Sequence, residues 1–156
     1  MIPIPIKYAI ESGSLFKGLT GDEPPLEFRI KILSFEPLDT SKLDNPENID
    51  KFYDLSQGIF MILSFEIISL HKRGISSKNI HSDLLVVDQD GFQFDESLDY
   101  HLCNYSDLSK TMGFYPFLGA ELRPKIKYTG AVPFYVPKDE TAEYRFAVRR
   151  GSVQEL

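Results

Sequence analysis

Asp88, Asp90 and Gly91 come nearest to a metal site in this sequence, because they resemble the beginning of a calcium-binding loop. An EF-hand needs a third oxygen ligand before the glycine and a glutamate at position twelve. Counted from Asp88, position five is Phe92 and position twelve is Asp99, so the pattern fails. We therefore interpret the motif as the turn of a β-hairpin, in which glycine takes a positive φ without steric cost.

His101 and Cys103 have the spacing of two residues on one face of a strand, and Met112 follows as a weak third candidate ligand for a soft metal. Two ligands do not make a site, and neither a CxxC motif nor a second histidine lies nearby. We expect a free thiol at Cys103 and no bound metal or cofactor.

His81, Ser82 and Asp83 are the residue types of a hydrolase triad. In an extended strand, adjacent side chains point to opposite faces, so these three cannot form a relay among themselves. Because no acid–base pair or activated nucleophile is visible, we expect that the protein is not an enzyme.

The connection between residues 100 and 117 is rich in aromatic residues, and it holds the strongest candidates for a binding surface. Aromatic side chains on a loop can anchor a partner. They could equally plug the open end of a β-sandwich. The candidate partner-binding residues are Tyr105, Phe114, Tyr115 and Phe117.

The net charge of −6 argues against nucleic acid as a partner, because nucleic-acid binding needs a basic surface. The basic residues Arg123, Lys125 and Lys127, and the pair Arg149 and Arg150, are expected to be solvated charges that protect strand edges. The 156 residues, 26% of them charged and 42% hydrophobic, fit one globular domain spanning 1–156.

The longest apolar run, residues 59–63, is too short to span a bilayer. The N-terminal sequence lacks the basic region, continuous apolar stretch and cleavage site of a signal peptide. As written, the chain is expected to be cytoplasmic; if a leader preceded it, it would be extracellular or on the cell surface.

The elements that must position these residues are organised around a central strand that begins at Ile59. Its first half is apolar on both faces and its second half on one, which is typical of a strand that begins deep in the protein and ends facing water. β-branched and aromatic residues favour a strand over a buried helix. One face carries Ile59, Met61, Leu63, Phe65 and Ile67; the other carries Phe60, Ile62, Ser64, Glu66 and Ile68.

Other alternations predict further strands at 4–10, 26–32, 80–87, 92–94, 126–136 and 144–148. A shift of phase predicts a β-bulge near Ile32. Residues 11–25 are expected to be a loop, Asn45 to begin a short helix that includes Tyr53, and the chain from Arg149 onward to be a frayed tail. Pro133 predicts an edge strand or a bulge. Together these elements predict an all-β, antiparallel β-sandwich of seven to eight strands, with one or two short helices in long connections.

Three segments carry a family resemblance: the apolar alternation from Ile59 to Leu70, the segment LLVVDQDGFQF, and the segment LRPKIKYTGAVPFYVPKD. The chain resembles the immunoglobulin-like domains of unknown function found on many bacterial and archaeal lipoproteins, and the mycobacterial immunoprotective antigen is similar in fold. The matching parts cover roughly forty per cent of the chain. Lys125 stands where this family commonly has a glycine after Pro124. The resemblance implies an immunoglobulin-like fold and no catalytic residues.

Two hypotheses for the function follow. The first is a non-catalytic interaction module that binds a protein partner. The alternative is a β-sandwich that binds a small ligand or a carbohydrate through the aromatic loop 100–117.

Overall fold

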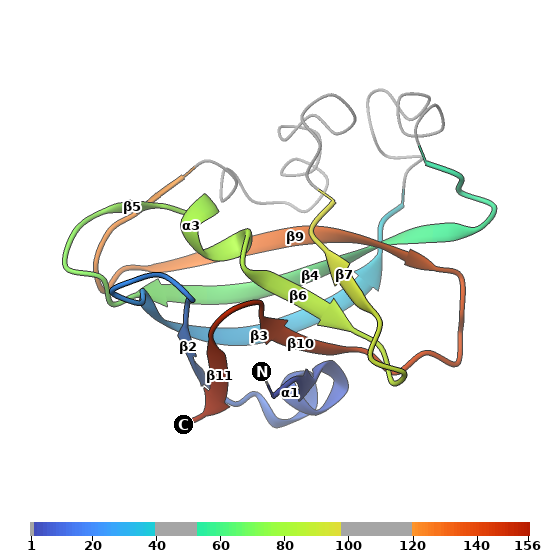
Figure 1. Cartoon of the computed structure of the whole chain (residues 1–156), viewed down its shortest axis with the longest axis horizontal. Helices are drawn as coiled ribbons and strands as arrows, with labels where there is room; N and C mark the ends of the chain where they lie inside the picture. The colour runs from blue at the N-terminus through green and yellow to red at the C-terminus, as the bar shows by residue number, and fades with distance from the viewer. Residues whose placement is uncertain (1, 40–52, 98–119) are drawn as a thin grey trace.

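The computed structural model describes residues 2–39, 53–97 and 120–156, which form two packed antiparallel sheets and a small ribbon (Figure 1). The larger sheet has the strand order β11-β2-β3-β4-β9 and the smaller one the order β1-β10-β6-β7. The bounds of the larger sheet are β2 Phe16–Leu19, β3 Glu27–Pro37, β4 Gly58–Ser69, β9 Lys127–Pro137 and β11 Ser152–Glu155. Those of the smaller sheet are β1 Ile4–Pro5, β6 Leu84–Val87, β7 Gln93–Asp95 and β10 Arg145–Val148.

The ribbon pairs β5 Ile75–Ser76 with β8 Glu121–Leu122, and the two described helices are α1 Ile6–Ser12 and α3 Lys78–His81. Eight of the described strands have three or more residues. The predicted antiparallel β-sandwich with a few short helices is therefore confirmed. None of the helices in the described ranges is long and apolar enough to cross a membrane.

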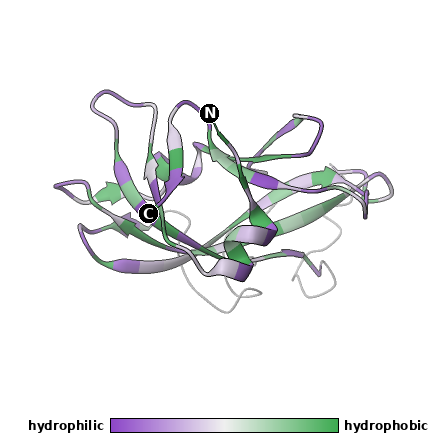
Figure 2. Ribbon diagram, turned by 90° about the horizontal axis from the view of Figure 1, so that it is seen from below, coloured by the Kyte–Doolittle hydropathy of each residue, from purple (hydrophilic) through white to green (hydrophobic). Residues whose placement is uncertain are grey.

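The central strand is β4, which pairs with β3 over residues 61–69 and with β9 over residues 58–68. Leu63, Phe65 and Ile67 are at most 1% exposed and face the smaller sheet, as the alternation predicted. Phe60 and Ile62 are buried on the opposite face, so the outer side of the first half of β4 is covered as well. In Figure 2 the strands carry most of the green, hydrophobic colour, whereas the connecting turns are largely purple. The core is thus built on β4.

The β-bulge predicted near Ile32 is present in β3, where the register against β4 shifts between Ile32 and Ser34. Ile32 is buried opposite Phe65, and Leu33 is the extra residue with 37% of its surface exposed. After the bulge, Phe35 returns to the inner face opposite Leu63. The change of apolar phase in the sequence therefore reports a real irregularity of the strand.

The hairpin predicted at Asp88 to Gly91 connects β6 to β7. The Asp88 Oδ1 atom accepts hydrogen bonds from the backbone N–H groups of Asp90 and Phe92, both at 2.9 Å. Gly91 has a φ of 89°, a value that favours glycine. In this turn the Asp88 side chain is thus the hydrogen-bond acceptor, and the Asp90 backbone is one of its two donors.

The long strand predicted at 126–136 is the continuous strand β9, which lies at the edge of the larger sheet. Pro133 lies within it, opposite Ile62 of β4. Since proline lacks an N–H donor, an edge position leaves the sheet ladder intact on the β4 side. The predicted edge position is confirmed.

The strand predicted at 4–10 is wrong after Pro5, because the chain turns there into α1. Ile6, Ala9 and Ile10 also have helical i, i+3, i+4 spacing, and Ile6 and Ala9 are buried whereas Tyr8 is 45% exposed. The two periods overlap in this short stretch, and packing on β3 favours the helical one. Gly13, with a φ of 63°, ends the helix.

Two further expectations are corrected at the other end of the larger sheet. The predicted loop 11–25 contains β2, and the predicted frayed tail after Arg149 contains β11, which pairs with β2. β11 buries a single apolar residue, Val153, and β2 contains Gly18. Such short strands have little pattern of their own and depend on pairing with each other.

The strand predicted at 80–87 begins only at Leu84, because the preceding residues form α3. The helix predicted from Asn45 falls mainly outside the described residues. Tyr53, at the end of that segment, packs edge-on against Phe60 with ring centroids 4.8 Å apart.

Candidate ligand groove

The residues predicted to bind a partner, Tyr105, Phe114, Tyr115 and Phe117, lie outside the described residues, as do His101, Cys103 and Met112. The structure therefore gives no test of the aromatic segment 100–117 or of the expected free thiol at Cys103. Both stay predictions.

Three of the residue sets considered from the sequence are described, beginning with His81, Ser82 and Asp83. The three lie at and after the end of α3, not in a strand. The Nδ1 atom of His81 lies 2.5 Å from the Oε2 atom of Glu96. The Ser82 hydroxyl donates a hydrogen bond to the backbone oxygen of Lys78 at 2.6 Å. The histidine and the serine are thus engaged with other partners.

The acidic turn at Asp88 and Asp90 does not gather a larger set of ligands. Across the described ranges, no group of three or more His, Cys, Asp or Glu side chains is arranged to hold a metal ion. The structure confirms the interpretation of this motif as a hairpin turn.

The basic residues lie at strand edges and turns. Lys127, on the edge strand β9, forms a 3.4 Å ion pair with Glu66 of β4. Arg149 follows β10 and forms an ion pair with Asp95 of β7. Lys125 lies in the turn before β9 and has a φ of 64°. Each of these basic residues thus belongs to a separate strand edge or turn.

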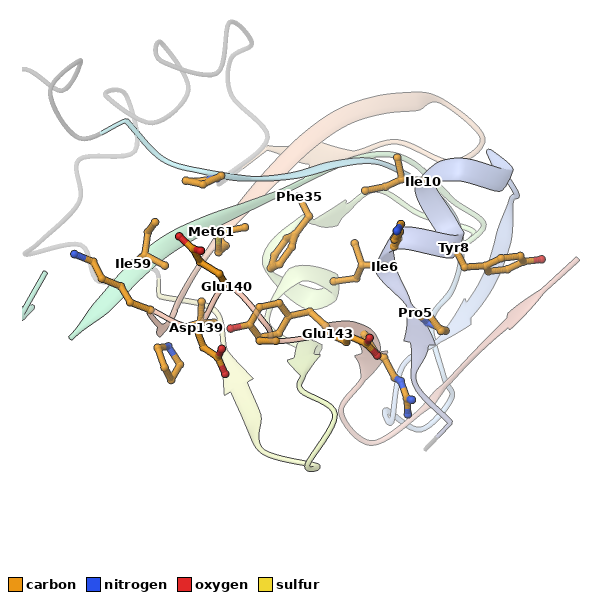
Figure 3. Close-up of a pocket in the computed structure, with 18 of the residues that line it drawn as sticks. Pro5, Ile6, Tyr8, Ile10, Phe35, Ile59, Met61, Asp139, Glu140 and Glu143 are labelled. Atoms are coloured by element: carbon orange, nitrogen blue, oxygen red, sulfur yellow. The ribbon is translucent and has the colours of Figure 1, made fainter. Parts of the chain in front are cut away.

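A groove that sequence analysis did not predict lies at one end of the sandwich (Figure 3). The strands β3, β4 and β9 have 11 or 12 residues each, whereas β6 and β10 have four. The smaller sheet therefore leaves one end of the larger sheet's inner face uncovered. Phe35, Ile59 and Met61 lie at that end and are only partly buried.

Helix α1 and the connection from β9 to β10 close the groove on its two sides, leaving a cavity of about 1270 Å³. From α1, Ile6 and Ile10 line the cavity. From the connection, Tyr144 packs edge-on against Phe35 with ring centroids 5.5 Å apart, and against Phe94 at 6.4 Å. We call this cavity the α1 groove, and it is lined by Ile6, Ile10, Phe35, Ile59, Met61 and Tyr144, with charged residues at its rim.

The rim of the α1 groove carries charges of both signs. Its acidic residues are Glu11, Asp139, Glu140 and Glu143, and its basic residues are Lys7, Lys138 and Arg145. Figure 3 shows Asp139, Glu140 and Glu143 along one side of the groove, across from Ile10 of α1. An apolar floor with a charged rim is typical of sites that bind a ligand with both apolar and polar parts.

Three residues that line the groove have shifted pKa values, and in Tyr8 a hydrogen bond with the Glu155 side chain raises the pKa of the phenol. Burial raises the pKa of the Tyr144 phenol, and the negative charges of Asp139 and Asp88 raise it further. Hydrogen bonds from the Thr141 side chain and backbone lower the pKa of Asp139. At neutral pH, Tyr144 is therefore a neutral hydrogen-bond donor and Asp139 is ionised. These groups suit binding by apolar contact and hydrogen bonds.

The sequence contained one signal of this groove. In the first half of β4, Ile59 and Met61 continue the apolar alternation of Leu63, Phe65 and Ile67 without a change of residue type. A pattern of that kind shows that a face is apolar. It does not show whether another layer covers the face, since that depends on the lengths of the strands in the second sheet.

Comparisons with known proteins add little to the geometry. No family model matches the sequence, and no curated protein matches it. A crystal structure of a conserved hypothetical protein from Bacillus anthracis is similar at 12% sequence identity, with a TM-score of 0.48, and the match covers 91% of this chain and 96% of that one. A similarity at this level gives no information on function.

Proposed function

We propose that this protein is a non-catalytic binding module that holds an extended apolar segment of a partner protein in the α1 groove. One observation carries the proposal. The inner face of the larger sheet is sealed at Leu63 and Phe65, which are 0% exposed, but remains partly open at Ile59 and Met61. Burying these open positions against a ligand would gain free energy from the hydrophobic effect.

The size of the cavity favours a segment of chain over a metabolite. Pockets for small molecules usually enclose about 300–1,000 Å³. The α1 groove, at about 1270 Å³, exceeds this range. It is also bounded by a helix on one side and by a connecting segment on the other (Figure 3). An extended peptide with several apolar side chains fits such a site.

The test uses a synthetic peptide with the apolar core Leu-Val-Leu-Val-Leu between serines, labelled with fluorescein. Fluorescence anisotropy measures its Kd for the protein. Ile10→Glu places a charge on the α1 side of the groove, at a position that is only partly buried. We expect this variant to bind at least about tenfold more weakly, because a charge in an apolar site must be desolvated.

The matched control is Leu33→Glu. Leu33 is also a partly exposed apolar residue, but it is the bulge residue of β3 and lies outside the lining of the groove. This variant should bind the peptide with the Kd of the wild type. Equal weakening in both variants, or no binding to the wild type, would contradict the proposal. Binding of small apolar dyes alone, abolished by Ile10→Glu, would also contradict the proposal, because the groove would then hold a small molecule and not a peptide segment.

The proposed role agrees with the expectation of an interaction module. The resemblance to immunoglobulin-like lipoprotein domains, the cellular location and the identity of the partner stay predictions. The aromatic segment 100–117 is a second candidate surface, and its role is independent of the α1 groove.

A further inference from the structure

We infer that the segment bound in the α1 groove carries a basic residue beside its apolar residues, and that Glu140 and Glu143 select for that charge. This inference rests on the proposed function, since it specifies the chemistry of the ligand at the same site.

The carboxylates of Glu140 and Glu143 are available to a ligand. Both residues are exposed at the rim, and neither side chain has a hydrogen bond or an ion pair within the described part of the chain. Asp139 differs, because its Oδ1 atom accepts hydrogen bonds from the backbone N–H and the hydroxyl of Thr141, at 2.9 and 2.6 Å. Asp139 therefore shapes the turn, whereas the two glutamates face the solvent with their charges uncompensated.

Lys138 lies within electrostatic range of an acidic residue outside the groove, Asp54. Hydrogen bonds from Ser56 lower the pKa of Asp54, and the positive charge of Lys138 contributes to the same shift. The Lys138 ammonium thus interacts with Asp54, which is not part of the groove lining. Its charge is partly compensated there.

The helix α1 adds no net charge to the rim. Its two charged lining residues, Lys7 and Glu11, are of opposite sign and lie four residues apart, the spacing of neighbours on one helix face. On the side of the β9–β10 connection, the one further cation among the described lining residues, Arg145, faces three carboxylates in the charge balance, those of Asp139, Glu140 and Glu143. The lining of the groove therefore carries a surplus of negative charge on the side formed by the β9–β10 connection.

The aromatic ring of Tyr144 strengthens the preference for a cation. It lines the groove next to Glu143 in sequence, and Phe35 and Phe94 hold it edge-on from two sides. A lysine or arginine side chain near a tyrosine ring gains a cation–π interaction. An apolar floor, an aromatic ring and two unpaired carboxylates together complement an apolar segment with an adjacent basic residue.

The test compares two peptides with the core Leu-Val-Leu-Val-Leu, one flanked by lysines and one by glutamates, by fluorescence anisotropy at low salt. We expect wild-type protein to bind the lysine peptide about tenfold more tightly. The variant Glu140→Gln/Glu143→Gln should bind both peptides within about twofold of each other. The control Glu36→Gln/Glu121→Gln removes the same charge from exposed positions outside the groove and should keep the preference.

The two possible failures are distinguishable. If the serine-flanked peptide binds but the lysine and glutamate peptides bind equally, or if the preference persists in Glu140→Gln/Glu143→Gln, the charge selection is overturned and the groove remains a binding site. If no peptide binds the wild type, the proposed function itself fails. Loss of the preference in the Glu36→Gln/Glu121→Gln control would also overturn the inference, because overall charge would then explain it.

Discussion

The Nδ1 atom of His81 lies 2.5 Å from the Oε2 atom of Glu96, and this contact joins α3 to the residue that follows β7. Glu96 also forms a β-bridge with Phe134 of β9. His81 is 4% exposed and the Glu96 side chain 17%. The bridge at Glu96 therefore links the end of β7 to β9, and the Glu96 side chain ties α3 to this junction through a hydrogen bond that is largely shielded from water.

Removing either member of the pair should destabilise the fold. We expect His81→Ala and Glu96→Ala each to lower the free energy of unfolding by about 1–3 kcal/mol, because each removes the hydrogen bond between the two side chains, which is largely shielded from water. Urea unfolding of both single variants and the double variant gives the coupling energy between the two residues, which should be about 1 kcal/mol or more. Additive losses would mean that the two side chains act independently.

Phe65→Ala should cost about 3–5 kcal/mol of unfolding free energy through the cavity that it leaves. Phe65 is 0% exposed on the inner face of β4, between Ile32 and Gly130 on the neighbouring strands. The matched control is Ile68→Ala on the outer face of the same strand, where the side chain is only partly buried and a smaller loss is expected. A loss below about 1 kcal/mol for Phe65→Ala in denaturant unfolding would contradict the face assignment.

Gly18→Ala should destabilise by about 1–3 kcal/mol, because the new methyl group overpacks the core. A Cβ atom at Gly18 would lie 2.2 Å from Cζ of Phe28, whose ring covers the glycine across the β2–β3 pair. Phe28 is 0% exposed, so a shift of its ring would disturb the core around it. In a Phe28→Leu background the same substitution should cost less, and thermal unfolding of the four proteins measures the difference.

Lys125→Gly should be neutral or stabilise by up to about 1 kcal/mol. Lys125 has a φ of 64°, where residues with a Cβ atom are strained and glycine is not. Lys125→Val, with a β-branched side chain, should destabilise clearly in the same urea experiment. A clear loss in Lys125→Gly would show that the lysine side chain stabilises the turn.

Asp83→Asn should stabilise the protein at pH 7. Burial raises the pKa of the Asp83 carboxyl above its ordinary value of 3.8, and the nearby Asp22 adds to the shift, while Arg150 and Arg149 oppose it. A raised pKa means that the folded state favours the protonated carboxyl. The stability that this group contributes is present below the ordinary pKa and is lost as the pH rises through the raised one.

The difference between wild type and Asp83→Asn should therefore narrow as the pH falls toward about 3.5, where both side chains are neutral. Melting temperatures at pH 7 and pH 3.5 measure it. If the variant is less stable than the wild type at pH 7, the Asp83 carboxylate makes a stabilising interaction that outweighs the cost of its burial.

The sequence by itself determined the features that depend on local chemistry. The alternation from Ile59 predicts β4, the phase shift after Ile32 predicts the bulge, and Gly91 after two aspartates predicts the hairpin. Each signal works because side-chain period and turn conformation are set by a few consecutive residues. A β-sandwich follows from several such strands in one chain.

Only the tertiary structure decided which apolar residues are covered. Ile6 and Ile10 fit both a strand and a helix, and contact with the larger sheet selects α1. β11 forms because β2 offers a free edge; the first pair of their register, Leu19 and Ser152, is 133 residues apart in the chain. The α1 groove exists because β10 and β6 are shorter than β4. Strand pairing and layer coverage are non-local, so the apolar alternation through Ile59 and Met61 marks an apolar face without showing that the face is left open.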